Sequence, residues 1–288
     1  KILGKHFQYS ADKFKKANFK TIKNVPLNKY DTVFVCVPDN QKFSIVEYCL
    51  KNNKHVLVEK PLLLRDKKKF NLLKKLADKN NLAFYTAYNH RFEPGLEKIR
   101  DLIAKKSIGK IYRCRIFYGN GTSLLVKKSK WRDKKLGVIS DIGSHLIDMC
   151  MFIFGKNFKK IKLLEANKFE NKAYDHSIIS LNINSISVEL EMTLCSWENS
   201  FNFDIIGSNG SIHMNSLCKW SNSEVSLKSR KYPSGFPKVK KFLFKKGDPS
   251  WKKEHHFFKK MIRQKRNKTT FLKDILISNS LTKLNNQF

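Results

Sequence analysis

The stretch Thr32-Val33-Phe34-Val35-Cys36-Val37, which stops at Pro38, decides the fold class of this chain. An unbroken run of β-prone residues is typical of a strand covered on both faces, as in a parallel sheet. Apolar residues then recur at helical spacing over residues 45–50, and His55-Val56-Leu57-Val58 predicts the next strand. The pattern therefore indicates a buried strand, a helix and a second buried strand.

The same alternation extends in both directions from this stretch. A helix is predicted over residues 70–77 and a strand over residues 82–85, while upstream Ile2-Leu3 predicts one more strand and Ser10 caps a helix. Short strands that alternate with helices of this length are typical of an α/β fold with a doubly wound parallel sheet.

The periodicity changes after a helix predicted over residues 96–103. Residues 111–118 are β-prone, and residues 186–194 alternate apolar and polar side chains, which predicts a half-buried antiparallel strand. A hairpin is predicted around the turn Ser208-Asn209-Gly210. We therefore expect two domains, residues 1–88 and residues 89–288, the second being α+β with a large open sheet, one face of which helices cover.

Charge is the most extreme feature of the composition. The chain has 58 Lys and Arg against 24 Asp and Glu, a formal net charge of +34. Such a charge suits a nucleic acid or an anionic membrane. However, the lysines are spread along the whole chain, and no basic motif interleaved with aromatic residues occurs. We therefore favour a solvated basic surface without a nucleic-acid partner, which would also attract an anionic substrate such as a nucleotide sugar.

Apolar residues make up 41% of the 288 residues, enough for a globular core. The longest apolar stretch, residues 146–154, is interrupted by Asp148 and is shorter than the roughly 20 residues that span a bilayer. The six cysteines form no C-x-x-C pair. We therefore expect a soluble, cytoplasmic protein with reduced thiols and no membrane partner.

Two loops at the ends of predicted strands carry polar residues. Pro38-Asp39-Asn40 follows the first strand, where ligands of open parallel sheets bind, although a plain connecting loop would look the same. Glu59-Lys60-Pro61 follows the second strand. Lys60 could bind a substrate hydroxyl and stabilise a developing alkoxide, and Glu59 could hold a cofactor. The alternative is a solvated lysine in a lysine-rich chain.

The third candidate is the run Asp141-Ile142-Gly143-Ser144-His145-Leu146-Ile147-Asp148. If it opens a helix, Asp141, His145 and Asp148 share one face. A histidine between two carboxylates is a candidate proton acceptor near neutral pH. A metal site is a competing interpretation, but no fourth ligand has a fitting spacing, and we expect no metal. The other alternative is a helix cap at Asp141 and a core histidine.

In chain order, these segments resemble the glucose-fructose oxidoreductase and inositol dehydrogenase (Gfo/Idh/MocA) family over nearly the whole chain. The resemblance rests on Val35-Cys36-Val37-Pro38, Lys54-His55-Val56-Leu57-Val58-Glu59-Lys60-Pro61, Asn89-His90-Arg91-Phe92, Ile108-Gly109-Lys110-Ile111, Trp131-Arg132, and Gly137-Val138-Ile139-Ser140-Asp141-Ile142-Gly143-Ser144-His145-Leu146-Ile147-Asp148. It implies a Rossmann-type domain followed by a domain with a large, mostly antiparallel sheet.

The resemblance also implies roles for individual residues. Lys60 resembles the lysine that contacts both substrate and nicotinamide, His145 the acid/base residue, and Asp141 a carboxylate that binds substrate and orients the histidine. With these three, Arg91 is expected in the substrate site. The expected contacts of NAD or NADP are Pro38, Asn40, Glu59, Lys60, Asn89, Trp131 and Arg132.

The sequence departs from the family pattern in three places. No G-x-G-x-x-G occurs, which indicates that the first strand-turn-helix unit, about 30 residues long, is missing ahead of Lys1. Lys5 and His6 stand where an acidic residue would hold the adenosine ribose, which leans towards NADP. Lys42 stands where many relatives have histidine.

We therefore expect reversible hydride transfer between nicotinamide and a secondary alcohol of a sugar, nucleotide sugar or cyclitol, carried out by a homo-oligomer. Two alternatives remain. One is a catalytically silent relative that binds a ligand or oligomerises, since the glycine loop is absent, and the other is an anion-binding protein, given the charge.

Overall fold

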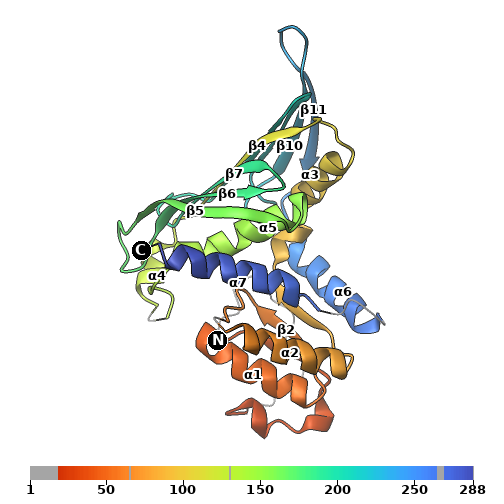
Figure 1. The fold of residues 1–288 in the computed structure, drawn as a ribbon, viewed down its shortest axis with the longest axis vertical. Helices are drawn as coiled ribbons and strands as arrows, with labels where there is room; N and C mark the ends of the chain where they lie inside the picture. Colours follow the sequence, from red (N-terminus) through yellow and green to blue (C-terminus); the bar gives the residue numbers. More distant parts are fainter. Residues whose placement is uncertain (1–18, 65, 130, 265–268, 288) are drawn as a thin grey trace.

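A computed structural model describes residues 19–64, 66–129, 131–264 and 269–287 of the chain. Two sheets lie one above the other along the long axis of the molecule (Figure 1). The smaller has the strand order β1-β2-β3 and the larger the order β11-β10-β9-β8-β4-β7-β6-β5. The strand expected at Ile2-Leu3 and the helix expected after Ser10 lie outside the described residues.

The described elements follow one another in the order expected for an α/β unit and then an α+β unit. They are η2 (Ile22–Asn24), η3 (Leu27–Lys29), β1 (Thr32–Val35), α1 (Asp39–Lys51), β2 (His55–Glu59), α2 (Lys67–Lys79), β3 (Phe84–Ala87), η4 (Asn89–Phe92), α3 (Pro94–Ala104), β4 (Ile111–Gly119), α4 (Ser123–Lys127), η5 (Ile139–Gly143), α5 (Ser144–Phe154), β5 (Phe158–Asn167), β6 (His176–Ile183), β7 (Ile186–Thr193), β8 (Ser200–Gly207), β9 (Gly210–Asn215), β10 (Ser223–Ser229), β11 (Lys238–Phe244), α6 (Ser250–Arg263) and α7 (Phe271–Asn285).

The three strands of the smaller sheet run parallel, as the sequence predicts. Helices α1 and α2 pack on one face, where Val46, Leu50 and Phe70 are fully buried, and α6 packs on the other through Phe258. The strand expected over residues 82–85 begins two residues later, at Phe84. The preceding residues are used otherwise, because the Leu82 amide closes the end of α2 on the Ala77 carbonyl and the Ala83 amide donates to His55 Nδ1.

The larger sheet is mostly antiparallel, as expected. The β8–β9 hairpin and the burial alternation along β7 are confirmed. The prediction that β7 is an antiparallel strand is only half right, because β7 is antiparallel to β6 but parallel to β4. The reason is that side-chain alternation reports which face is buried and not the direction of the neighbouring strand.

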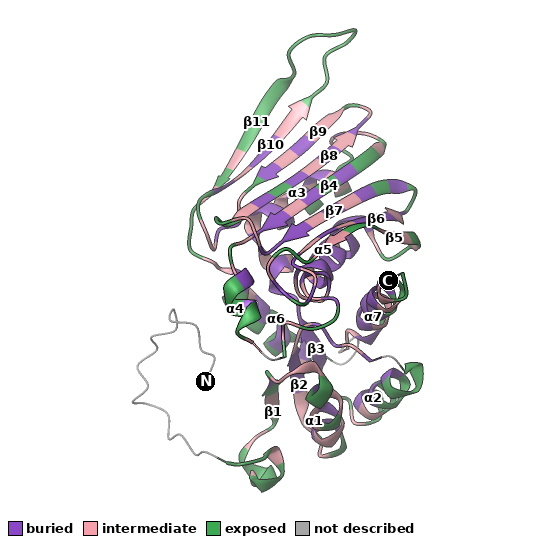
Figure 2. Ribbon diagram, turned by 90° about the vertical axis from the view of Figure 1, so that its left-hand side faces the viewer, coloured by how far each residue is buried: buried purple, intermediate pink, exposed green. Residues whose placement is uncertain are grey.

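Helices cover one face of the larger sheet, as the alternating burial along its strands shows (Figure 2). Helix α5 lies in that core, packed against α3 and α7. The opposite face carries polar side chains in cross-strand ion pairs, such as Arg115 with Glu189 and Glu191, and His213 with Asp204. Oligomer formation through this face remains a prediction.

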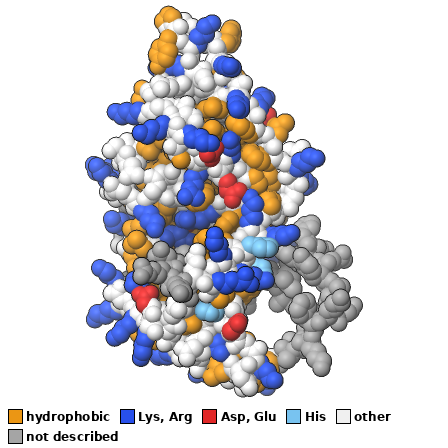
Figure 3. Space-filling view, turned by 90° about the vertical axis from the view of Figure 1, so that its right-hand side faces the viewer, with side chains coloured by type: hydrophobic (Ala, Val, Ile, Leu, Met, Phe, Trp, Pro, Cys, Tyr) orange, Lys and Arg blue, Asp and Glu red, His pale blue; other side chains and the backbone are white. Residues whose placement is uncertain are grey.

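The charged residues and cysteines are distributed as the composition suggests. Lys and Arg are scattered over one whole face of the molecule rather than gathered in one patch (Figure 3). All six cysteines are free, and four of them, Cys49, Cys114, Cys150 and Cys218, are buried. Among the described residues, no helix has the length and apolar content that crossing a bilayer requires.

Candidate active site

Lys60 lies directly after β2, at the carboxyl edge of the parallel sheet, and reaches across to the second domain. Its Nζ donates to Asp141 Oδ1 at 2.5 Å and to the Asp141 carbonyl at 2.9 Å. Only 12% of the Lys60 side chain is exposed. The second and third candidate segments of the sequence therefore meet at one place, although 81 residues separate them.

Lys42 on α1 holds the backbone around Lys60 in position. The Lys42 Nζ donates to the carbonyls of Lys60 and Pro61, at 3.2 and 2.8 Å, and to Asp39 Oδ1 at 2.7 Å. The residue is only 2% exposed, and burial lowers the pKa of its ammonium. Lys42 thus ties the first helix to the loop that presents Lys60.

Asp141 is held between two cations. Its Oδ1 accepts from Lys60, and its Oδ2 accepts from Arg132 Nη2 at 2.7 Å. Burial alone would raise the pKa of this carboxyl, but Lys60 and Arg132 together bring the pKa well below its usual range. Asp141 is therefore a carboxylate at neutral pH whose hydrogen bonds go to Lys60 and Arg132 rather than to His145.

The backbone explains why Asp141 does not face His145 as the helical spacing suggests. Residues Ile139–Gly143 form a π-helical turn, and the α-helix α5 begins only at Ser144. A π-helical turn is wider than an α-helical one and displaces its residues from the i, i+4 line. The prediction that Asp141 opens a regular helix is therefore wrong by three residues.

His145 pairs with a second histidine. The Nδ1 atoms of His145 and His90 lie 3.1 Å apart, and the two ring centroids are 4.2 Å apart. Burial, the His90 ring and the Lys60 ammonium together hold the pKa of His145 well below its usual range. Because His145 remains half-buried rather than enclosed, it is a neutral imidazole that a ligand can reach at neutral pH.

Asp148 and Arg91 bind each other and form a group separate from Lys60 and Asp141. Arg91 donates through Nε and Nη2 to the two oxygens of Asp148, at 2.7 and 2.8 Å, and Lys273 lies 3.7 Å from the same carboxylate. Asp148 is 1% exposed. Asp141, His145 and Asp148 therefore have separate partners, and they do not form the metal cluster weighed above; a substrate contact for Arg91 stays a prediction.

Several of the remaining predicted cofactor residues follow strands of the small sheet. Pro38 is the N-cap of α1, shortly after β1 ends at Val35, Asn40 is exposed in the first turn of that helix, and burial raises the pKa of Glu59. Trp131 is 52% exposed beside Arg132. Asn89 is buried and donates to Ser250 Oγ at 2.9 Å. The cofactor contacts stay predictions.

Tyr118 at the end of β4 and Lys219 after β9 adjoin the histidine pair. Lys219 Nζ donates to the Tyr118 hydroxyl at 2.8 Å, and the Tyr118 ring centroid lies 5.9 Å from that of His90. Burial lowers the pKa of Lys219 to about 8. No pattern in a lysine-rich sequence singles out this residue.

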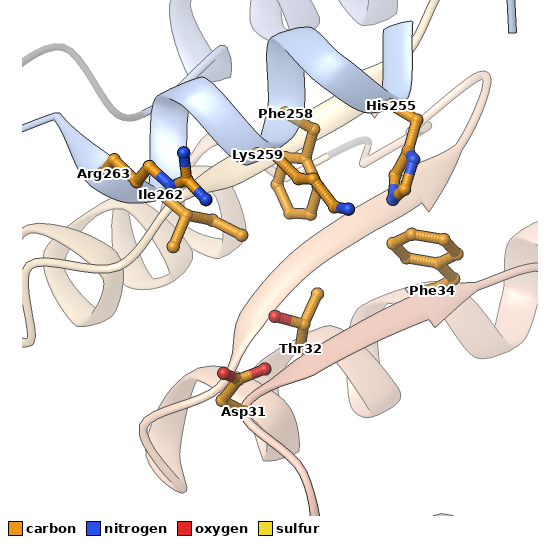
Figure 4. Close-up of a pocket in the computed structure, with 8 residues that line it drawn as sticks. All are labelled: Asp31, Thr32, Phe34, His255, Phe258, Lys259, Ile262 and Arg263. Carbon is orange, nitrogen blue, oxygen red and sulfur yellow. The ribbon is translucent and has the colours of Figure 1, made fainter. Parts of the chain in front are cut away.

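A separate groove of about 620 Å³ lies between β1 and α6 (Figure 4). Phe34 on β1 faces His255 and Phe258 on α6, with ring centroids 6.0 and 6.2 Å away. None of Lys60, Asp141 and His145 lines this groove. It lies along β1, which is an edge strand of the small sheet among the described residues, and it is not the candidate active site.

Four residues of the cleft were not predicted from the sequence as parts of the site, namely Lys42, His90, Tyr118 and Lys219. His90 stands in the Asn89-His90-Arg91-Phe92 run, so a histidine beside a predicted site residue was an available signal. Lys42 could have been suspected from its position in the first turn of a helix that follows a cofactor loop. Tyr118 lies in an ordinary strand pattern.

Comparison with known proteins places both halves of the chain in one family. Residues 4–88 match the model of the oxidoreductase family with an NAD-binding Rossmann fold, and residues 96–213 match the GFO/IDH/MocA C-terminal domain. Among curated proteins, the chain is 29% identical over 114 residues to glucose-6-phosphate 3-dehydrogenase of Bacillus subtilis, covering 38% of this chain and 32% of that protein. It is 27% identical over 128 residues to scyllo-inositol 2-dehydrogenase (NADP(+)) of the same organism, covering 43% and 35%. The matched part thus spans about a third of these relatives.

Solved structures share the fold. An oxidoreductase from Desulfitobacterium hafniense, described as NADPH-dependent, has a TM-score of 0.77 at 17% identity over 89% of this chain and 77% of its own. Levoglucosan dehydrogenase in complex with NADH and levoglucosan has a TM-score of 0.71 at 19% identity over 89% and 78%. Together with the two matched domains, this fold shows that the chain belongs to the GFO/IDH/MocA oxidoreductase family.

Proposed function

We propose that this protein transfers a hydride between a nicotinamide dinucleotide and a secondary alcohol carbon of a sugar, nucleotide sugar or cyclitol. The observation that carries the proposal is that Lys60, at the carboxyl edge of the parallel sheet, bonds to Asp141 and lies near enough to His145 for its charge to act on that ring. The named activities of the curated relatives, which are sugar and inositol dehydrogenases, support the same substrate class.

The residues at this edge fit a dinucleotide. Ligands of open parallel sheets bind outside the carboxyl ends of the strands, where Pro38, Glu59 and Lys60 lie. Residues that would hold the dinucleotide are Pro38, Asn40, Glu59, Asn89, Trp131 and Arg132. When bound, the nicotinamide supplies the hydride acceptor for oxidation, or the donor for reduction.

Lys60 is built to bind the reacting hydroxyl. An ammonium has three N–H donors, and Asp141 takes two of them through its Oδ1 and its carbonyl. The third is available for the oxygen of a bound alcohol. As the hydroxyl proton is removed, negative charge builds on that oxygen, and the nearby ammonium would stabilise the alkoxide until the carbonyl forms.

His145 is built to accept the hydroxyl proton. When the ring proton of His145 is on Nδ1, this N–H donates a hydrogen bond to His90 Nδ1. The Nε2 lone pair of His145 can then take a proton from the alcohol. The lowered pKa keeps the ring neutral at pH 7. In the reverse direction the protonated ring returns the proton to the new hydroxyl group. Asp141 keeps Lys60 and Arg132 in place.

Turnover measurements on the full-length protein test this proposal. With NAD and NADP and a panel of sugars and cyclitols, Lys60→Ala and His145→Ala should each lower kcat about 10²- to 10⁴-fold, the range of general acid–base and oxyanion effects. Circular dichroism should show that both variants remain folded, and Lys245→Ala, an exposed lysine, is the matched control. Wild-type turnover in both variants would contradict the proposal.

A further inference from the structure

Lys219 is a half-buried cation without a counter-ion. Its ammonium donates to the Tyr118 hydroxyl at 2.8 Å and lies 4.7 Å from the Trp220 ring centroid. Within the part of the chain that the structure describes, no carboxylate oxygen lies within 4 Å of it. The other buried lysines differ, since Lys42 is paired with Asp39 and Lys273 faces Asp148.

The acidic residues whose charges act on Lys219 are Asp248, Glu93 and Asp141, and each accepts a hydrogen bond from another group. Glu93 accepts from the Cys218 amide at 2.7 Å, and Asp248 accepts from Ser250 Oγ at 2.5 Å. Both carboxylates raise the pKa of Lys219, but burial outweighs them and lowers it to about 8. At neutral pH the ammonium is therefore still charged, partly stripped of water, and not neutralised by the protein.

This cation faces the candidate active site. The Tyr118 ring that holds it packs edge-on against His90, and His90 bonds to His145. The positive charges of Lys219 and Lys60 both act on the two histidines. Lys60 comes from the nucleotide-binding domain, whereas Lys219 and Tyr118 come from the larger sheet. The two lysines thus approach the histidine pair from different domains.

We propose that Lys219 and Tyr118 form an anion subsite of this cleft, so that the sugar or cyclitol substrate carries a phosphate or carboxylate group. The inference rests on the proposed function, because it assigns a substrate class to the same site. A partly desolvated ammonium without a counter-ion gains most from a charge-assisted hydrogen bond, and an anionic oxygen on the substrate supplies it. The Tyr118 hydroxyl, which already accepts from Lys219, can donate to the same anion.

Calorimetric binding of three probes in the presence of NADH tests the subsite. The probes are glucose 6-phosphate, glucuronate and glucose, so that phosphate, carboxylate and neutral forms are compared on one sugar. The protein should bind at least one anionic probe about 10- to 100-fold more tightly than glucose, the worth of a hydrogen bond to a charged group. Lys219→Met should abolish this preference, Tyr118→Phe should reduce it, and Lys219→Arg should retain most of it.

Lys245→Met is the control, and failure of the subsite proposal can be told apart from failure of the proposed function. Lys245→Met removes an equal charge from an exposed position and should leave the preference intact. If glucose and both anionic probes bind equally, or if Lys219→Met and Lys245→Met weaken anion binding to the same extent, the subsite proposal is overturned. Binding needs no turnover, so a protein that prefers the anionic probes but keeps wild-type turnover in Lys60→Ala and His145→Ala would contradict the proposed function and leave the subsite in place.

Discussion

Two clusters of polar and charged side chains in this molecule each contain lysine and aspartate but differ in how completely these groups are bonded. The buried ion-pair cluster consists of Arg91, Asp148 and Lys273, and each oxygen of Asp148 accepts a hydrogen bond from Arg91. The cleft cluster consists of Lys60, Asp141, His145, His90 and Lys219. In it the Nε2 of His90 is buried without a partner, and Lys219 has no carboxylate within 4 Å among the described residues.

The two clusters differ in whether all their polar groups are bonded, and we infer from this difference that one serves the fold and the other serves function. A buried ion pair whose lone pairs and protons are all bonded contributes to a defined fold, and removing one partner leaves an uncompensated charge. A cluster with open donors and acceptors carries a desolvation cost that a ligand can relieve. The buried ion-pair cluster should therefore govern stability, and the cleft cluster should govern binding and turnover.

Breaking the buried ion-pair cluster should have the largest effect. Asp148→Ala leaves Arg91 and Lys273 buried without their carboxylate, so we expect the free energy of unfolding to fall by about 3–5 kcal/mol. Urea unfolding followed by circular dichroism measures this change. Asp101→Ala, which removes an exposed carboxylate paired with Lys98 and Lys105, should cost much less, because solvent screens exposed ion pairs. Equal losses in the two variants would remove the distinction between buried and exposed pairs.

Glu254 on α6 gives a pH-dependent test of the same region. It is 2% exposed, accepts from the Tyr85 hydroxyl at 3.1 Å, and burial raises its pKa to about 8. Between about pH 4.3, the pKa in the unfolded chain, and about pH 8, the folded chain keeps a proton that the unfolded chain has released. The stability contribution of this group is thus lost as the pH rises through that window.

Glu254→Gln removes this titration. Relative to the wild type, the variant should gain about 4 kcal/mol in the free energy of unfolding between pH 5 and pH 9, since each pH unit up to the folded pKa is worth about 1.4 kcal/mol. Urea unfolding at both pH values measures the difference, and the comparison of variant with wild type cancels the titration of all other groups. A difference that does not change with pH would show that Glu254 is ionised in the folded chain.

Of these changes, a substitution at His90 should have the smallest effect. It tests whether the cleft cluster governs turnover. His90→Leu removes the hydrogen-bond partner of His145 Nδ1, so kcat should fall about tenfold while KM changes little. On the acidic side of the pH profile, kcat/KM falls as His145 becomes protonated. This acidic limb should move to higher pH in His90→Leu, because the His90 ring contributes to the low pKa of His145. His90→Gln, which can still donate and accept, should recover part of the rate. An unchanged pH profile in His90→Leu would exclude a positioning role.

The sequence predicted the parts of the fold that depend on local pattern. The parallel strands β1 and β2 and the hairpin around Gly210 are where their residues indicate. The parallel pairing of β7 with β4 could not be predicted, because it depends on which distant strand lies alongside. The later start of β3 reflects two hydrogen bonds, to the Ala77 carbonyl and to His55 Nδ1, that no propensity encodes.

The candidate site was predicted only where residues follow a strand or share a motif. Lys60 was placed by its position after a strand, and the structure brings it to Asp141. The partner of His145 could not be predicted, because His90 lies 55 residues away in the chain and only the folded structure brings the two rings together. Lys219 could not be singled out either, since its proposed role rests on its bond to Tyr118 and on the lack of a carboxylate within 4 Å among the described residues, which only the folded chain shows.

We propose that Lys60 and His145 act on the same hydroxyl group of one bound alcohol. The most direct measurement is the single-turnover rate of hydride transfer in Lys60→Ala, His145→Ala and the double variant. Two residues that act as a unit are not additive, so the double variant should be no more than about tenfold slower than the slower single variant. A double variant in which the two losses multiply in full, or a single variant that keeps the wild-type rate, would contradict the claim.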